Sequence, residues 1–298
     1  MTDLVVSIDW LAERILGEDG APAEDPPVRV VDVRDAWEYD GMGHLPTAIN
    51  VQFDAFRSEP GSEDGVDGGG GDGSDASDVD GDVGHLPGAE VFADLMGQHG
   101  LTREDTIVAY DDTNGVFAAR FLVTALVYGF DDVHLLDGDL SAWRQQHPIS
   151  NESIELPPTE VEPIRVDGAN SPLVDADDVR AAIDGSAGPE PDAEAVLLDT
   201  RDQFEFDEGH IPGAVRFDWQ EAVDSETRGV KSRETLEGLF AERGVTPDKR
   251  VLLYCNTARR LSHTYVVLRW LGFEDVGIYE GSLTEWREIG GELVSNEE

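Results

Sequence analysis

The sequence predicts an α/β protein with two tandem domains of one fold, each a parallel sheet flanked by helices. Three observations support this prediction: the length of the chain, an internal duplication, and an alternation of short apolar segments with longer amphipathic ones. A chain of 298 residues is long for one core and comfortable for two. Its 40% of hydrophobic residues, with six Trp and eleven Phe, can fill both cores.

The duplication is the strongest of the three observations. Five motifs occur twice in the same order: 31–35 matches 198–202, 37–40 matches 204–207, 43–46 matches 209–212, 106–110 matches 250–254, and 136–143 matches 279–286. A unit of this length exceeds a solenoid repeat and is typical of a duplicated domain. We therefore expect a first domain over 1–149 and a second over 171–298, joined by a proline-containing linker over 150–170.

Apolar runs within each half predict buried strands, and amphipathic runs predict helices. Strands are expected at 28–33, 107–110, 196–199 and 251–254, and helices at 117–128 and 259–271. In the last segment, Leu261, Tyr265, Leu268 and Leu271 recur at intervals of three and four residues, which is the spacing of one helical face. Strands that alternate with helices favour parallel sheets covered by helices.

One segment, 58–84, belongs to neither half of the duplication. It holds nine acidic residues, nine glycines and no basic residue. Such a segment buries too little apolar surface to offset its ordering entropy, so we expect it to be disordered. A calcium-binding repeat is the alternative, because Asp and Gly alternate there, but the spacing is irregular and no apolar residue recurs.

The charge of the chain is strongly negative, with 64 acidic residues against 21 basic ones and a net charge of −43. A polyanion repels phosphate backbones, which argues against nucleic-acid binding. The composition resembles that of a salt-in halophile, whose carboxylated surface needs salt to screen its self-repulsion. The chain has no run of about 18 apolar residues, and its first residues lack a signal-peptide pattern. A cytoplasmic protein without membrane association is therefore expected.

The chain has one cysteine, Cys255, which follows an apolar strand and precedes a helix. A single cysteine excludes an intramolecular disulfide, and it is either a buried core residue or a nucleophile. The following residues, Asn256-Thr257-Ala258-Arg259-Arg260, are poor neighbours for an apolar core site. A loop there would direct backbone N–H groups at the sulfur and place it at a helix N-terminus beside two arginines. These features favour a thiolate, and hence a nucleophile.

Taken together, these motifs resemble the rhodanese family. The resemblance is carried by the following residues, in family order: Asp199-Thr200-Arg201, Gly209-His210-Ile211-Pro212-Gly213-Ala214, Tyr254-Cys255 with Arg260, and Tyr279-Glu280-Gly281-Ser282 with Trp286. It covers nearly the whole chain except the acidic segment and the linker. It implies two rhodanese-like domains and a sulfurtransferase without cofactor or metal ion. In that activity Cys255 takes sulfur from a small anionic donor, thiosulfate, as a persulfide and passes it to cyanide or a thiol.

The resemblance also implies roles for further residues. The loop residues Asn256, Thr257, Ala258, Arg259 and Arg260 would bind the donor. Asp199 and Arg201 would brace the surroundings of the loop, or else form a surface ion pair. Trp219 would line the mouth of the pocket, or else pack in the core.

Two other residues receive no catalytic role. His210 is structural in the family, so we do not assign it as a base. In the first half, Asp111 stands where Cys255 stands in the second. A carboxylate cannot accept sulfane sulfur, so we expect the first half to be inert and to form one wall of the cleft.

Three rival functions remain open at this level. A rhodanese-like phosphatase would need Cys-X5-Arg, whereas Cys255 and Arg260 form Cys-X4-Arg. A 3-mercaptopyruvate sulfurtransferase of the mammalian type would have an arginine where Glu205 stands, and Glu205 would repel a substrate carboxylate. Two loop guanidinium groups instead suit a small dianion such as thiosulfate. A persulfide carrier or regulatory module without turnover would keep both the cysteine and the loop.

Overall fold

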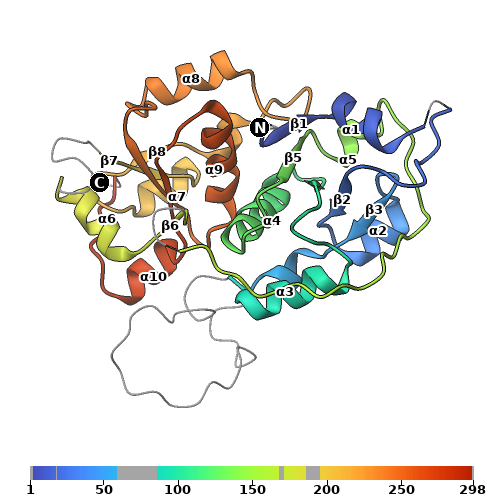
Figure 1. The fold of residues 1–298 in the computed structure, drawn as a ribbon. Coiled ribbons are helices and arrows are strands. Elements are labelled where there is room, and N and C mark those ends of the chain that lie inside the picture. The colour runs from blue at the N-terminus through green and yellow to red at the C-terminus, as the bar shows by residue number, and fades with distance from the viewer. Residues whose placement is uncertain (1–2, 18, 59–85, 168–170, 186–194, 297–298) are drawn as a thin grey trace, which may run out of the picture.

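The computed structural model describes residues 3–17, 19–58, 86–167, 171–185 and 195–296. They form two halves, each with a five-stranded sheet in which every strand pair is parallel (Figure 1). The predicted fold class is therefore confirmed. The acidic segment 58–84, except Ser58, lies outside the described residues, as does any calcium site within it.

The N-terminal half has its strands in the order β1-β5-β4-β2-β3, with β4 at the centre. Its elements are β1 (Val5–Ser7), α1 (Ile8–Ile15), β2 (Arg29–Asp32), α2 (Ala36–Met42), β3 (Ala48–Asn50), η1 (Phe53–Phe56), α3 (Ala89–Gln98), β4 (Ile107–Tyr110), α4 (Val116–Val127), β5 (Val133–Asp137) and α5 (Leu140–Trp143). Strand and helix alternate along the chain, so the helices cover the faces of the parallel sheet.

The C-terminal half repeats this arrangement, with strand order β6-β10-β9-β7-β8 and β9 at the centre. Its elements are β6 (Leu173–Val174), α6 (Ala176–Ile183), β7 (Ala195–Asp199), α7 (Gln203–Glu208), β8 (Val215–Arg216), η3 (Trp219–Ala222), α8 (Arg233–Ala241), β9 (Arg250–Tyr254), α9 (Arg259–Leu271), β10 (Val276–Tyr279) and α10 (Ser282–Glu288). Strand for strand the topology equals that of the first half, as the duplicated motifs predict.

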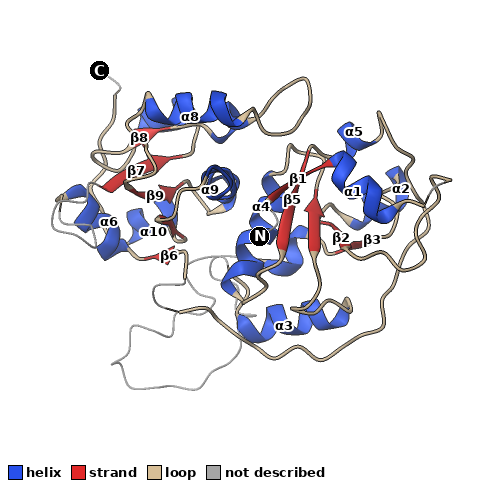
Figure 2. Ribbon diagram, turned by 45° about the horizontal axis from the view of Figure 1, so that its top comes forward, coloured by secondary structure: helices blue, strands red, loops and turns tan. Residues whose placement is uncertain are grey.

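Helices α4 and α9 lie side by side between the two sheets (Figures 1 and 2). Helix α4 is apolar on nearly every side, with Val116, Phe121 and Val127 among its many buried residues. A helix of that kind must be enclosed by other elements. One apolar cluster accordingly contains residues of both halves, such as Phe121 and Val267. The halves therefore share a core.

Buried polar contacts also join the two halves. The guanidinium of Arg120 on α4 is fully buried. It donates to the carboxylate of Glu280, the residue after β10, with 2.7 Å between Nη1 and Oε2. Arg228 donates through Nε to the buried Asp139, at 2.7 and 2.8 Å. The Val230 N–H donates to Asp137 at 2.8 Å. These contacts fix the orientation of the halves.

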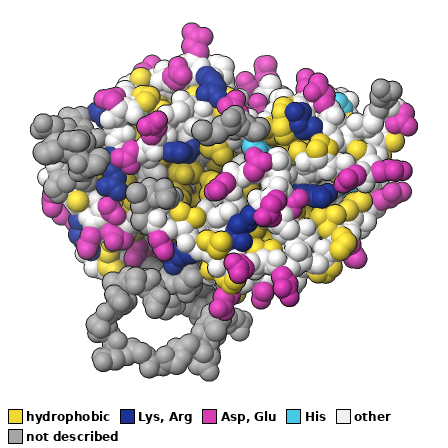
Figure 3. Space-filling model, in the orientation of Figure 1, with side chains coloured by type: hydrophobic (Ala, Val, Ile, Leu, Met, Phe, Trp, Pro, Cys, Tyr) yellow, Lys and Arg dark blue, Asp and Glu magenta, His cyan; other side chains and the backbone are white. Residues whose placement is uncertain are grey.

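Residues 151–167, within the predicted linker, form no helix or strand. They lie along the N-terminal half, where the Thr159 N–H donates to the Gly97 carbonyl at 2.9 Å and the Val166 N–H donates to the Val127 carbonyl at 2.8 Å. No helix within the described ranges is long and apolar enough to span a bilayer. Asp and Glu side chains are spread widely over the visible face in Figure 3, which agrees with a carboxylated surface.

Candidate active site

Cys255 lies directly after β9, the central strand of its sheet, and before α9. In open parallel sheets, ligands bind at this carboxyl edge of the strands. The start of α10 holds the residue in place: the Cys255 N–H donates to Ser282 Oγ at 3.2 Å, and the Leu283 N–H donates to the Cys255 carbonyl at 3.1 Å. The Ser282 hydroxyl in turn donates to the Tyr279 carbonyl at 2.9 Å. Sequence reasoning assigned Ser282 no role, although both the duplicated motif at 279–286 and the family motif at 279–282 include it.

The loop after Cys255 turns through Ala258, whose φ of 55° lies in the left-handed region. Thr284 Oγ1 on α10 donates to the Asn256 carbonyl at 2.9 Å and fixes the first turn of the loop. In the described part of the chain, the N–H groups of 256–260 donate to no acceptor. Successive unsatisfied N–H groups at a helix start are suited to bind an anion.

In the N-terminal half, the equivalent loop surrounds a carboxyl group. The Asp111 carboxylate, after β4, accepts hydrogen bonds from the N–H groups of Thr113, Gly115, Phe117 and Ala118 at 2.7 to 3.0 Å. Burial raises the pKa of Asp111, and the four backbone hydrogen bonds oppose that rise. The side chain at the position equivalent to Cys255 therefore occupies the anion-binding loop of its own half.

The two loop arginines diverge. Arg260 forms a bidentate ion pair with Glu205 on α7, with 2.8 Å between Nη2 and Oε1. Asn256 Nδ2 donates to the same Oε1 atom at 2.7 Å. The Arg259 guanidinium instead stands 4.9 Å above the ring of Phe117 in the N-terminal half. Glu205 was expected only to repel an anionic substrate, and its pairing with Arg260 was not predicted.

Asp199 and Arg201 form a buried ion pair rather than a surface one. Their side chains are 0% and 2% exposed, with 2.6 Å between Arg201 Nη2 and Asp199 Oδ2. Arg201 also donates to the Gly209 carbonyl at 2.8 Å. Between the two residues, the Thr200 N–H donates to the Tyr254 carbonyl at 3.0 Å. The segment after β7 is thus tied to the residue that precedes Cys255.

Thr257 of the loop is half-buried, whereas Trp219 and His210 are buried. Trp219 packs edge-on against His263, with 5.2 Å between ring centroids, so it lies against α9. Burial lowers the pKa of His263 to about 4, so this ring is neutral at neutral pH. His210 stacks on Phe206 at 3.7 Å, and its Nδ1 atom lies 2.8 Å from the Phe206 carbonyl. These contacts agree with a structural histidine.

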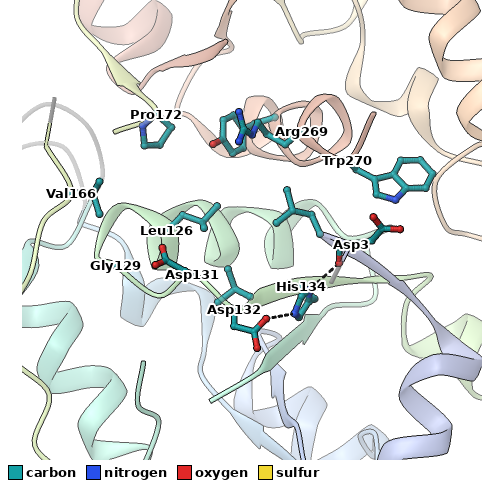
Figure 4. Close-up of a pocket in the computed structure, with 13 residues that line it drawn as sticks. Asp3, Leu126, Gly129, Asp131, Asp132, His134, Val166, Pro172, Arg269 and Trp270 are labelled. Atoms are coloured by element: carbon teal, nitrogen blue, oxygen red, sulfur yellow. Dashed lines mark hydrogen bonds and ion pairs between the residues drawn. The ribbon is translucent and has the colours of Figure 1, made fainter. Parts of the chain in front are cut away.

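Two cavities lie between the halves. The larger, of about 910 Å³, is lined by Asp132, His134, Arg269 and Trp270 among others (Figure 4). Its α9 residues lie in the last two turns of that helix, whereas Cys255 precedes the first turn, so this cavity is remote from the thiol. The smaller, of about 430 Å³, includes Arg259 together with residues of the N-terminal half such as Asp111 and Phe117. The N-terminal half thus provides most of the wall that faces Arg259.

Comparisons with known proteins agree with this geometry. The model of the rhodanese-like domain matches residues 9–146 and 177–289. A thiosulfate sulfurtransferase of Corynebacterium glutamicum is 30% identical over 95% of this chain and 87% of its own length. The sulfur carrier protein TtuD of Thermus thermophilus is 29% identical over 99% and 98%.

Among solved structures, SseA from Escherichia coli, described as a 3-mercaptopyruvate sulfotransferase, superimposes with a TM-score of 0.73 at 26% identity. The match covers 94% of this chain and 99% of SseA. Both halves of the duplication therefore correspond to a known domain, and the chain belongs to the rhodanese family of sulfurtransferases.

Proposed function

We propose that the chain transfers sulfane sulfur from thiosulfate to a thiophilic acceptor, cyanide or a thiol, through a persulfide on Cys255. The observation that carries the proposal is the loop 255–260. It presents a lone thiol together with backbone N–H groups, and the same loop in the other half binds a carboxylate through four N–H groups. The similarity to the thiosulfate sulfurtransferase of C. glutamicum supports the choice of donor.

The reaction has two displacement steps at sulfur. In the first, the Cys255 thiolate attacks the outer sulfur of thiosulfate, and the sulfur–sulfur bond of the donor breaks to release sulfite with its electron pair. In the second, cyanide or a thiolate attacks the terminal sulfur of the persulfide, and the Cys255 thiolate leaves. The N–H groups of 256–260 stabilise the negative charge on donor and persulfide.

The test is steady-state turnover with thiosulfate and cyanide in high salt, compared with 3-mercaptopyruvate as donor. Thiocyanate should form catalytically, with a larger kcat/KM for thiosulfate because Glu205 repels the carboxylate of mercaptopyruvate. A mercaptopyruvate value tenfold above that of thiosulfate would assign the chain to the activity described for SseA. Persulfide formation without turnover would assign it to a carrier such as TtuD.

A further inference from the structure

Glu205 and its duplicate Glu38 occupy equivalent positions but make different contacts. Each is the third residue of a short helix, α7 and α2, after an aspartate N-cap. In α2, the Glu38 carboxylate accepts from the Asp35 N–H at 3.3 Å and completes a reciprocal capping box. In α7, the Asp202 side chain accepts from the Glu205 N–H at 2.8 Å, but the reciprocal bond is not formed.

The Glu205 carboxylate turns to the catalytic loop instead. It accepts from both Nη atoms of Arg260 and from Nδ2 of Asn256, so it engages two of the five loop side chains. The first turn of α4, 116–119, carries no arginine, and among the described residues Glu38 forms no ion pair like that of Glu205 with Arg260. The difference between the two glutamates therefore follows from the loop that each one faces.

We propose that Glu205 is a specificity-determining residue: its carboxylate occupies the side-chain donors of the loop at which an anionic sulfur donor would bind. This inference rests on the proposed function and deepens it. An incoming anion must compete with Glu205 for Arg260 and Asn256, while the loop N–H groups stay available. The resting site then selects donors that bind through the backbone and disfavours those that need a free guanidinium.

The charges of Glu205 and Arg260 hold the Glu205 carboxylate against the loop. The hydrogen bond from Arg260 lowers the pKa of Glu205 to about 2, against the opposing effect of burial. Burial would lower the pKa of Arg260, but the hydrogen bond to Glu205 and the charge on Cys255 raise it above its ordinary value. Both partners are therefore charged at neutral pH. Their side chains are 19% exposed for Arg260 and 22% for Glu205, so an anion from solvent can reach the pair.

Binding without chemistry gives the direct test. In the full chain carrying Cys255→Ser, calorimetry should measure the Kd of thiosulfate and of sulfite before and after adding Glu205→Gln. A glutamine at this position cannot carry the competing charge, so both Kd values should fall roughly two- to fivefold, as expected for release of a partly exposed ion pair. Glu205→Ala should act in the same direction. Glu208→Gln is the matched control, because it removes one carboxylate from an exposed position of the same helix, α7, and should leave both Kd values unchanged.

A second measurement uses the active protein. Glu205→Gln should lower the KM for thiosulfate by a similar factor. It should leave kcat within about twofold, because removing the charge of Glu205 affects the binding of thiosulfate and not the transfer of sulfur. Unchanged or weaker binding in both Glu205 variants would overturn the inference and leave Glu205 as a residue that only positions Arg260. If wild-type protein fails to turn over thiosulfate, the proposed function fails, whereas sulfite binding still decides the role of Glu205.

Discussion

Cys255 and Asp111 stand at equivalent ends of the two central strands, and the loops that follow them make different contacts. Both follow a buried tyrosine, and both are almost fully buried themselves. Asp111 satisfies the N–H groups of its loop with its own carboxylate. Cys255 leaves the N–H groups of its loop available, and in the proposed function its thiolate is the nucleophile. One side chain therefore separates a closed anion site from an open one.

At the residue scale, Cys255→Ser should fold normally and form no persulfide. The chain holds no second cysteine that could replace it, and a serine hydroxyl matches the thiol in shape. Intact-protein mass spectrometry after thiosulfate treatment should find the mass of one added sulfur on wild type and none on the variant. An equal adduct on both proteins would place the sulfur elsewhere and contradict the assignment.

Sequence patterns located the secondary structure closely. The helix predicted over 259–271 has those bounds in α9, and the helix predicted over 117–128 is α4, Val116–Val127. Periodicity and strand composition are local, so they can be read from neighbouring residues. The pairs Arg260–Glu205 and Arg120–Glu280 join residues 55 and 160 positions apart, and no local pattern predicts them. That is why the helices were predicted from the sequence and the partner of Arg260 was not.

At the element scale, the contact of α4 with the loop after β10 should depend on Arg120. Arg120→Ala removes the cation that pairs with the Glu280 carboxylate. Glu280 is only 8% exposed, so water cannot fully replace that cation. Breaking one partner of a buried ion pair should lower the free energy of unfolding by about 3 kcal/mol. Denaturant unfolding at constant high salt would measure it.

The control is Asp177→Asn, which breaks the pair between Asp177 and Arg180 on α6, where Asp177 is 86% exposed. Its unfolding midpoint should stay close to that of wild type, since exposed pairs contribute little. Equal midpoints for Arg120→Ala and Asp177→Asn would mean that the buried pair between the halves does not stabilise the fold.

For the whole molecule, the net charge of −43 means that repulsion between carboxylates destabilises the folded state, and salt reduces this repulsion. Part of that charge lies in the acidic segment, and its first residue contacts the chain beyond its end: the Ser58 hydroxyl donates to the Leu86 carbonyl at 2.9 Å. We therefore expect that the chain can be shortened between these residues without moving the elements on either side.

Deleting 59–84 should accordingly leave activity largely intact. This deletion removes the whole acidic segment except Ser58. It should also slightly lower the salt concentration needed for half-maximal activity, because nine carboxylates are removed and no cation is lost. Salt titrations of turnover for both chains would measure this. Loss of most activity would assign the segment a structural or binding role.

Helices α4 and α9 bury their apolar side chains in a cluster to which both sheets contribute. Domains with separate interiors melt one after the other, whereas halves that share an interior should melt in a single cooperative step. Scanning calorimetry in high salt should then give one endotherm, and two resolved endotherms would mean independent melting. For the same reason, a protease cut within 151–167 should yield two fragments that elute together from a sizing column until denaturant separates them.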